Sequence, residues 1–177
     1  RGMLVSTRPR YDVVVKVVSA KCDAPKDIDR ADVLRRYRMV FEHDRAGRLV
    51  EAHEFEHLRI ARDRFESSLL DELVRDASRT VKIDGSDVVI AHAYVERRVR
   101  PLNLFFAECD EEAAIAAACD WGQSIKDLAR SNIFAGDLLT KNFGRTRRGR
   151  IVFYDYDELH WLTDCNFRTI PEARSYD

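Results

Sequence analysis

A short stretch near the end of the chain carries residue types that could hold a cation. Asp137 stands five residues before Asn142, a basic turn follows, and an apolar run then leads into the acidic stretch DYDE at 155–158. Acidic side chains this close together repel one another by roughly a kcal/mol per close pair, even at a high effective dielectric. A bound cation removes that repulsion, so the pattern predicts a cation site.

The spacing of these residues is typical of phosphoryl transfer. In protein kinases a catalytic-loop Asp, an Asn five residues later and an Asp on the next hairpin position ATP and magnesium. Asp137 and Asn142 have the D-x-x-x-x-N spacing, and Asp155 lies 155 − 142 = 13 residues further on. A hairpin that turns at 147–149 would return Asp155 alongside Asn142. Asp157, two residues on, would then point to the same face as Asp155, as alternate residues of a strand do.

A lysine upstream fits the same chemistry. The run VVVK, which ends at Lys16, resembles the V-A-I-K strand whose lysine anchors ATP phosphates. Each signal is common by itself: Asp137 could be a turn residue, 142–144 a loop-to-strand junction, and 155–158 a solvated acidic face. The apolar run 151–154 predicts a buried strand, whose end is not freely solvated. The joint order of the signals therefore favours a nucleotide and magnesium site.

Hydrophobic periodicity predicts the elements that position these residues. We expect a strand at 13–18, a helix from Asp29 to about Gly47, a short helix around 69–74, a strand at 88–95 after an Asp84-Gly85 turn, and a helix at 111–130. This order predicts an α+β fold with two lobes: an N-lobe-like part at 1–97, a hinge at 98–101, and a partial C-lobe at 102–177.

Composition excludes several classes of protein. Lys plus Arg number 30 against 31 for Asp plus Glu, so the basic excess typical of nucleic-acid binding is missing. No apolar run approaches the roughly 20 residues that cross a bilayer, and the first residues lack a signal-peptide core. The four cysteines are scattered and predict free thiols. We therefore expect a cytoplasmic protein without a nucleic-acid or membrane partner.

Several segments together resemble the bacterial isocitrate dehydrogenase kinase/phosphatase family. They are SNIFAGD (131–137), KNFG (141–144), GRIVFYDYDE (149–158), YVERR (94–98) with PLNL (101–104), EHDR (42–45) with GR (47–48), and NFR (166–168) with IP (170–171). The resemblance covers nearly the whole chain. It implies a protein-kinase-like fold that phosphorylates a serine of isocitrate dehydrogenase, removes that phosphate again, and thereby controls entry into the glyoxylate bypass.

The resemblance also implies a role for each site residue. One ATP and Mg²⁺ site would serve both activities. Asp137 would be the base, Lys141 would lie near the γ-phosphate, Asp157 would matter more for dephosphorylation, and Glu51 stands where the family has a catalytic Asp. The nucleotide would contact Lys16, Gly2 in the glycine-rich loop, Glu96 and Arg97. The metal would be held by Asn142 and Asp155.

Family members are far longer than 177 residues. We therefore expect a kinase-like fold truncated at both ends, with a chain that begins inside the phosphate loop and stops soon after Pro171. Leu138, Leu139, Ile151 and Phe153 would then be partly uncovered, and the isolated chain poorly stable. Two other readings stay open: a truncated, non-catalytic remnant, and an atypical small-molecule phosphotransferase that uses the same Asp, Asn and Asp.

Overall fold

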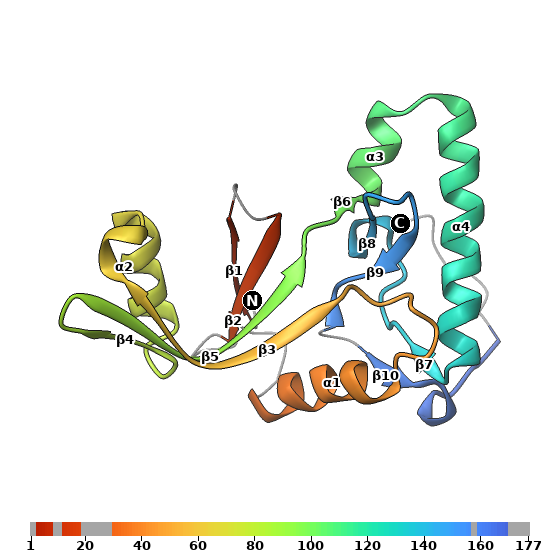
Figure 1. Cartoon of the computed structure of the whole chain (residues 1–177). Helices are drawn as coiled ribbons and strands as arrows, with labels where there is room; N and C mark the ends of the chain where they lie inside the picture. The colour runs from red at the N-terminus through yellow and green to blue at the C-terminus, as the bar shows by residue number, and fades with distance from the viewer. Residues whose placement is uncertain (1–2, 9–11, 19–29, 157–158, 170–177) are drawn as a thin grey trace, which may run out of the picture.

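The computed structural model describes residues 3–8, 12–18, 30–156 and 159–169, which form a mixed α/β fold (Figure 1). In the described part of the chain, strands form three antiparallel sheets. The largest has the order β1-β2-β5-β3, and β4 also pairs with β5. Its strands are β1 Met3–Arg8, β2 Val13–Val18, β3 Ala52–Ala61, β4 Val81–Asp84 and β5 Asp87–Arg97.

The pairing of β2 with β5 brings the predicted lysine beside Glu96. Lys16 lies opposite Tyr94, and Val14 lies opposite Glu96. Directly paired residues share a face of a sheet, and so do residues two apart on one strand. Lys16, Tyr94 and Glu96 therefore all point to the same face. The strand predictions at 13–18 and 88–95 are confirmed, and Gly85 makes the predicted turn with a φ of +61°.

Four α-helices lie among the described residues: α1 Arg30–His43, α2 Ser67–Asp76, α3 Leu102–Glu108 and α4 Glu111–Arg130. The bounds of α4 match the prediction, because the Asp110 side chain accepts a hydrogen bond from the Ala113 amide and caps its first turn. Helix α1 ends at His43 rather than near Gly47. There Asp44 Oδ1 accepts hydrogen bonds from the amides of Ala46 and Gly47, which turn the chain out of the helix.

The predicted hairpin is present and belongs to a second, smaller sheet. Its strands are β6 Arg100–Pro101, β8 Phe143–Arg145 and β9 Ile151–Phe153. Phe143 pairs with Phe153, and Gly149 takes a φ of +86° in the turn. Two residues of the predicted hinge, 100–101, pair with β8. The remaining elements are β7 Ile133–Phe134, β10 His160–Trp161, and the 3-10 helices η1 Arg62–Arg64, η2 Thr140–Asn142 and η4 Leu162–Asp164.

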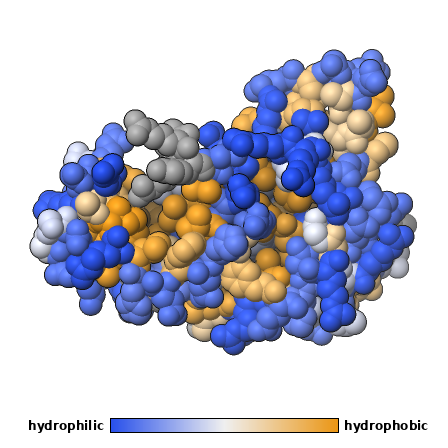
Figure 2. Space-filling view, in the orientation of Figure 1, coloured by the Kyte–Doolittle hydropathy of each residue, from blue (hydrophilic) through white to orange (hydrophobic). Residues whose placement is uncertain are grey.

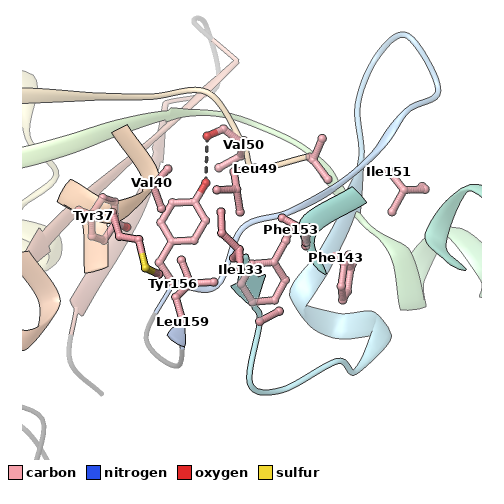
Figure 3. Close-up of a cluster of buried hydrophobic side chains, with 14 of the residues drawn as sticks. Tyr37, Val40, Leu49, Val50, Ile133, Phe143, Ile151, Phe153, Tyr156 and Leu159 are labelled. Carbon is pink, nitrogen blue, oxygen red and sulfur yellow. Dashed lines mark hydrogen bonds between the residues drawn. The ribbon is translucent and has the colours of Figure 1, made fainter. Parts of the chain in front are cut away.

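One large hydrophobic cluster joins the main sheet and α1 to α3, α4 and the small sheet. Figure 3 shows the part of this cluster in which Tyr37 of α1 lies near Tyr156 and the small sheet contributes Phe143 and Phe153. Ile151 and Phe153 are fully buried in it, so the expectation that they are partly uncovered is wrong. Helix α4 and the segment that follows α1 cover them. Leu138 is half-buried and Leu139 is 56% exposed, as expected.

A second cluster lies between α2 and the main sheet, to which β4 belongs. Leu70, Leu73, Val88 and Ile90 are buried in it. Figure 2 shows hydrophobic side chains reaching the surface in this region of the molecule. Among the described residues, no helix is long and apolar enough to cross a membrane.

Candidate active site

Lys16 lies at the junction of the two predicted lobes, where its ammonium has two close partners. Lys16 Nζ is 2.8 Å from Glu96 Oε2 and donates a hydrogen bond of 2.9 Å to the carbonyl oxygen of Tyr154. The rings of Tyr154 and Tyr156 lie 6.0 and 5.6 Å from the same nitrogen, within the range of cation–π attraction. The lysine predicted from β2 therefore contacts the residue immediately before Asp155.

Glu96 is 3% exposed, and a buried carboxylate has to be paired. Besides the ammonium of Lys16, it accepts a hydrogen bond of 2.8 Å from the Tyr37 hydroxyl of α1. The Tyr37 ring stacks on Tyr94 at a centroid distance of 3.6 Å, which fixes the hydroxyl in place. Glu96 was predicted to contact the nucleotide; in the structure its carboxylate holds Lys16.

The Asp137 loop is closed by hydrogen bonds that end on Asn142. The amide of Leu139 donates to Asp137 Oδ1 over 3.1 Å, and Asn142 Nδ2 donates to the Asp137 carbonyl over 3.2 Å. Asn142 is only 5% exposed, and its backbone carbonyl oxygen accepts a hydrogen bond of 3.1 Å from the backbone amide of Tyr154. The predicted return of the hairpin to Asn142 is thus observed.

Lys141 lies beside Asp137 on the exposed side of this loop. Its Nζ is 3.8 Å from Asp137 Oδ2, and its carbonyl accepts a hydrogen bond from the Tyr154 hydroxyl. Burial, and then the nearby charge of Asp155, raise the pKa of Tyr154, so this hydroxyl stays a donor at neutral pH. An exposed ion pair of this kind contributes little to stability, so Lys141 is free to bind an anion instead.

Asp155 follows Tyr154 directly and is half-buried. A continuous set of contacts therefore runs from Lys16 through Tyr154 to Asn142 and Asp137. Strand β9 ends at Phe153, so the strand alternation used to place Asp155 and Asp157 on one face does not apply. Asp157 and Gly2 both lie outside the described residues.

The donor set suits a hard cation with few protein ligands. Magnesium takes oxygen ligands, keeps several waters, and is commonly bound by one or two carboxylates together with phosphates. Asn142 and Asp155 offer an amide oxygen and a carboxylate. Among the described residues, no three His, Cys, Asp or Glu side chains converge as a cage for a metal. The residues present fit magnesium held jointly with a nucleotide.

Arg48 is a residue that the sequence did not single out for this site. Its side chain is 6% exposed, with Nη2 2.8 Å from Asp120 Oδ1 and Nε 2.8 Å from Asp127 Oδ2. Nη1 donates to the Ile151 carbonyl over 3.1 Å, and the Ile151 amide donates to Asp120 Oδ2 over 2.7 Å. Arg48 thus binds the backbone carbonyl of Ile151, and Asp120 of α4 binds its backbone amide, which fixes the first residue of β9. The sequence offered two signals: the seven-residue spacing of the two aspartates on α4, and the GR pair at 47–48 within the family resemblance.

The charges of this network shift the pKa values of its members. Burial alone would lower the pKa of Arg48, but the hydrogen bonds and charges of Asp120 and Asp127 raise it. Burial alone would raise the pKa of Asp120, but Arg48 and the Ile151 amide together lower it. For Asp127, the hydrogen bond from Arg48 is the largest cause of a lowered pKa. All three groups are therefore charged at neutral pH.

Glu51 contacts Arg97 and His53, which do not belong to the set of contacts that runs from Lys16 to Asp137. Its carboxylate accepts a hydrogen bond of 3.2 Å from Arg97 Nε, which lowers the pKa of Glu51, and lies 3.4 Å from His53 Nε2. Glu51 and Arg97 line a cleft whose walls include neither Lys16 nor Asp137. The predicted site residues therefore fall into two places.

Comparison with known proteins agrees with the residue pattern. A family model for the isocitrate dehydrogenase kinase/phosphatase (AceK) kinase domain matches residues 1–177. The isocitrate dehydrogenase kinase/phosphatase of Anaeromyxobacter dehalogenans is 52% identical over 97% of this chain and 29% of its own length. Its namesake from Xanthomonas axonopodis pv. citri is 50% identical over 99% of this chain and 30% of its own length.

A more divergent relative shows the same coverage. Isocitrate dehydrogenase kinase/phosphatase 1 of Pseudoalteromonas translucida is 46% identical over 98% of this chain and 29% of its own length. The chain thus spans about 30% of the length of the curated relatives it matches. Since the family model covers the whole chain and the identities lie near one half, the chain belongs to the isocitrate dehydrogenase kinase/phosphatase (AceK) kinase domain family.

Proposed function

We propose that this chain carries the phosphoryl-transfer site of an ATP- and Mg²⁺-dependent kinase/phosphatase that acts on a serine of isocitrate dehydrogenase. One observation carries the proposal: the backbone of Tyr154 joins Lys16 to the distant Asn142, whose side chain in turn hydrogen-bonds to the carbonyl of Asp137. Phosphoryl transfer depends mainly on positioned charges, and these are the side chains that position them in protein kinases. The names of the relatives support the substrate.

The nucleotide would lie where Lys16 can reach its phosphates. A lysine ammonium is a compact donor that binds phosphate as a point charge. The carboxylate of Glu96 and the carbonyl of Tyr154 hold this ammonium from two sides, so its direction is set before the nucleotide arrives. We further propose that residues 1–97 and 102–177 correspond to the two lobes of a protein kinase, joined at 98–101.

Asn142 and Asp155 would hold magnesium. When bound, the ion neutralises and orients the phosphate oxygens. The side-chain nitrogen of Asn142 already donates a hydrogen bond to the Asp137 carbonyl, so the side-chain oxygen remains to bind the ion. Arg48 acts indirectly, since it fixes Ile151 at the start of the strand that leads to Asp155.

Asp137 would accept the proton of the attacking hydroxyl. Its Oδ1 is occupied by the Leu139 amide, and Lys141 Nζ lies 3.8 Å from Oδ2. That ammonium is close enough to Asp137 to contact a transferred phosphoryl group as well. For the reverse reaction we propose Asp157 as the residue that orients the attacking water. Gly2 would belong to the loop that covers the phosphates.

Asp155→Asn tests the proposal most directly. The substitution removes one charge from the magnesium site at nearly constant volume. Magnesium-dependent ATP binding, measured by calorimetry, should weaken by about tenfold or more, the scale of a lost charge-assisted contact. Phosphate transfer to and from isocitrate dehydrogenase should fall with it.

Asp63→Asn is the matched control, because Asp63 is exposed on η1 and contacts none of the site residues. It should leave ATP binding unchanged. If Asp155→Asn left the magnesium-dependent ATP affinity unaltered, Asp155 would not be a magnesium ligand, and the proposed phosphoryl-transfer site would be contradicted.

A further inference from the structure

A cleft of about 470 Å³ lies on the molecule apart from the Lys16–Asp137 contacts. Its walls come from three segments: 47–51 after α1, 97–99 at the end of β5, and the turn 146–150 of the β8–β9 hairpin. Lys16, Asp137 and Asn142 do not line it. The volume falls in the range of small-molecule pockets.

Arginines dominate the lining of this cleft. Five of them meet two acidic residues there, a difference of 5 − 2 = 3 positive charges: Arg97, Arg98, Arg147, Arg148 and Arg150 against Asp12 and Glu51. The walls also include the apolar side chains Val50, Val99 and Val152.

Some of these arginines are already paired. Arg97 donates to Glu51 over 3.2 Å, and Arg147 Nε lies 2.9 Å from Asp12 Oδ2. Arg150 donates to the Ala46 carbonyl over 3.0 Å. In the part of the chain that the structure describes, the guanidinium groups of Arg98 and Arg148 have neither a hydrogen bond nor an ion pair.

The backbone holds the two unpaired arginines in place. The Arg98 amide donates to the Asp12 carbonyl over 3.0 Å, which ties the end of β5 to the start of β2. The turn that carries Arg148 is closed by hydrogen bonds between Thr146 and Arg150 in both directions, of 2.9 and 3.1 Å. A cleft lined by more arginines than carboxylates favours the binding of an anion.

We propose that this cleft is a second binding site, which takes a phosphate-bearing small molecule with Arg98 and Arg148 as its principal anion ligands. The planar guanidinium donates two parallel hydrogen bonds to phosphate oxygens. The valines provide a surface for an apolar portion of the ligand. The limited volume favours a small molecule over an extended acidic peptide.

Pyrophosphate is a suitable probe, titrated by calorimetry into the full chain without magnesium. All measurements use a background that carries Lys16→Met together with Glu96→Gln, called the Lys16→Met protein below, so that the nucleotide site does not contribute and no charge of the buried pair is left alone. The double variant Arg98→Gln, Arg148→Gln should bind pyrophosphate about tenfold or more weakly, because it loses two charge-assisted contacts. The matched control Arg59→Gln, Arg75→Gln removes the same charge from exposed arginines elsewhere and should retain the affinity.

Amide hydrogen exchange provides a readout independent of the variants. Bound pyrophosphate should slow exchange at 146–150 in the Lys16→Met protein and leave α2 unchanged. Equal weakening in the cleft and control variants, or pyrophosphate affinity no tighter than about 1 mM in the Lys16→Met protein, would overturn the proposal. So would binding of an oligoglutamate peptide in this cleft without binding of pyrophosphate.

Discussion

At the scale of single residues, the position of the phosphate-binding lysine depends on a buried carboxylate from a neighbouring strand. Glu96 contacts Lys16 Nζ at 2.8 Å and the Tyr37 hydroxyl at 2.8 Å. Helix α1 therefore supplies the neutral hydroxyl that binds Glu96, and strand β5 supplies the negative charge that pairs with Lys16. The lysine and its carboxylate come from adjacent strands of one sheet, so their distance is set by sheet register.

Glu96→Gln should be strongly destabilising. The amide can still accept the hydrogen bond from Tyr37, but the Lys16 ammonium loses its counter-charge in a site where both side chains are almost fully buried. Loss of one partner of a buried ion pair costs about 3–5 kcal/mol. Urea unfolding measures this change. Tyr37→Phe, which loses only the hydroxyl, should cost about 1 kcal/mol; equal losses in the two variants would contradict the assigned roles.

At the scale of elements, Arg48 connects the segment after α1 to helix α4 and strand β9. Its two aspartates have lowered pKa values, so their contribution to stability depends on pH. An unfolded aspartate has a pKa of about 3.9. The contribution is complete above that value and is lost as the pH falls through the lower folded pKa.

Asp120→Asn should therefore flatten the acid limb of the stability curve. Between about pH 5 and pH 3 the wild-type chain binds protons as it unfolds, and the variant lacks one of the carboxylates responsible. Urea midpoints at several pH values measure the slope. Asp63→Asn should keep the wild-type slope, and an unchanged slope in Asp120→Asn would show that its carboxylate has no lowered pKa.

Close packing of β6 against β8 makes a second prediction at this scale. A Cβ atom at Gly144 would lie 2.2 Å from Val99 Cγ2 and 2.7 Å from Val99 Cβ. Gly144→Ala should destabilise the chain by about 1–3 kcal/mol, the usual cost of overpacking. Adding Val99→Ala removes the closest contact and should restore part of the loss in thermal unfolding. A neutral Gly144→Ala variant would contradict the observed spacing of the two strands.

At the scale of the whole molecule, one core includes residues from both predicted lobes. Val33 and Tyr37 of α1 are buried in the same cluster as Leu128 of α4 and Phe153 of β9. Shared burial couples the stability of the two parts. The predicted hinge at 98–101 thus lies between two parts of the chain that share one core.

The shared core predicts a single unfolding transition. Trp121 and Trp161 pack against this cluster, so their fluorescence reports its opening, whereas far-UV circular dichroism reports all helices and strands. The two urea curves should coincide, as expected for two-state unfolding. Phe153→Ala should shift both curves together, by about 3–5 kcal/mol. Separate transitions would indicate lobes that unfold independently.

The sequence allowed accurate prediction of elements with strong local signals. Helix 111–130 has its own cap at Asp110, and the strand at 13–18 is a β-branched run. Strand β3 was not predicted, because it carries charged and histidine side chains on an exposed edge and shows no apolar alternation. Helix α3 is short and directly follows the polar, proline-containing stretch 96–101, and no helix was predicted there.

The spacing of Asp137, Asn142 and Asp155 by itself determined that the chain returns to Asn142, because a hairpin of 13 residues leaves few ways to return. Only the tertiary structure decided which residues hold these side chains. Strand register places Glu96 beside Lys16. Helix packing places Arg48 beside Ile151, which is 103 residues away in the sequence. Contacts at such separations depend on how the elements dock, and local sequence patterns do not record that docking.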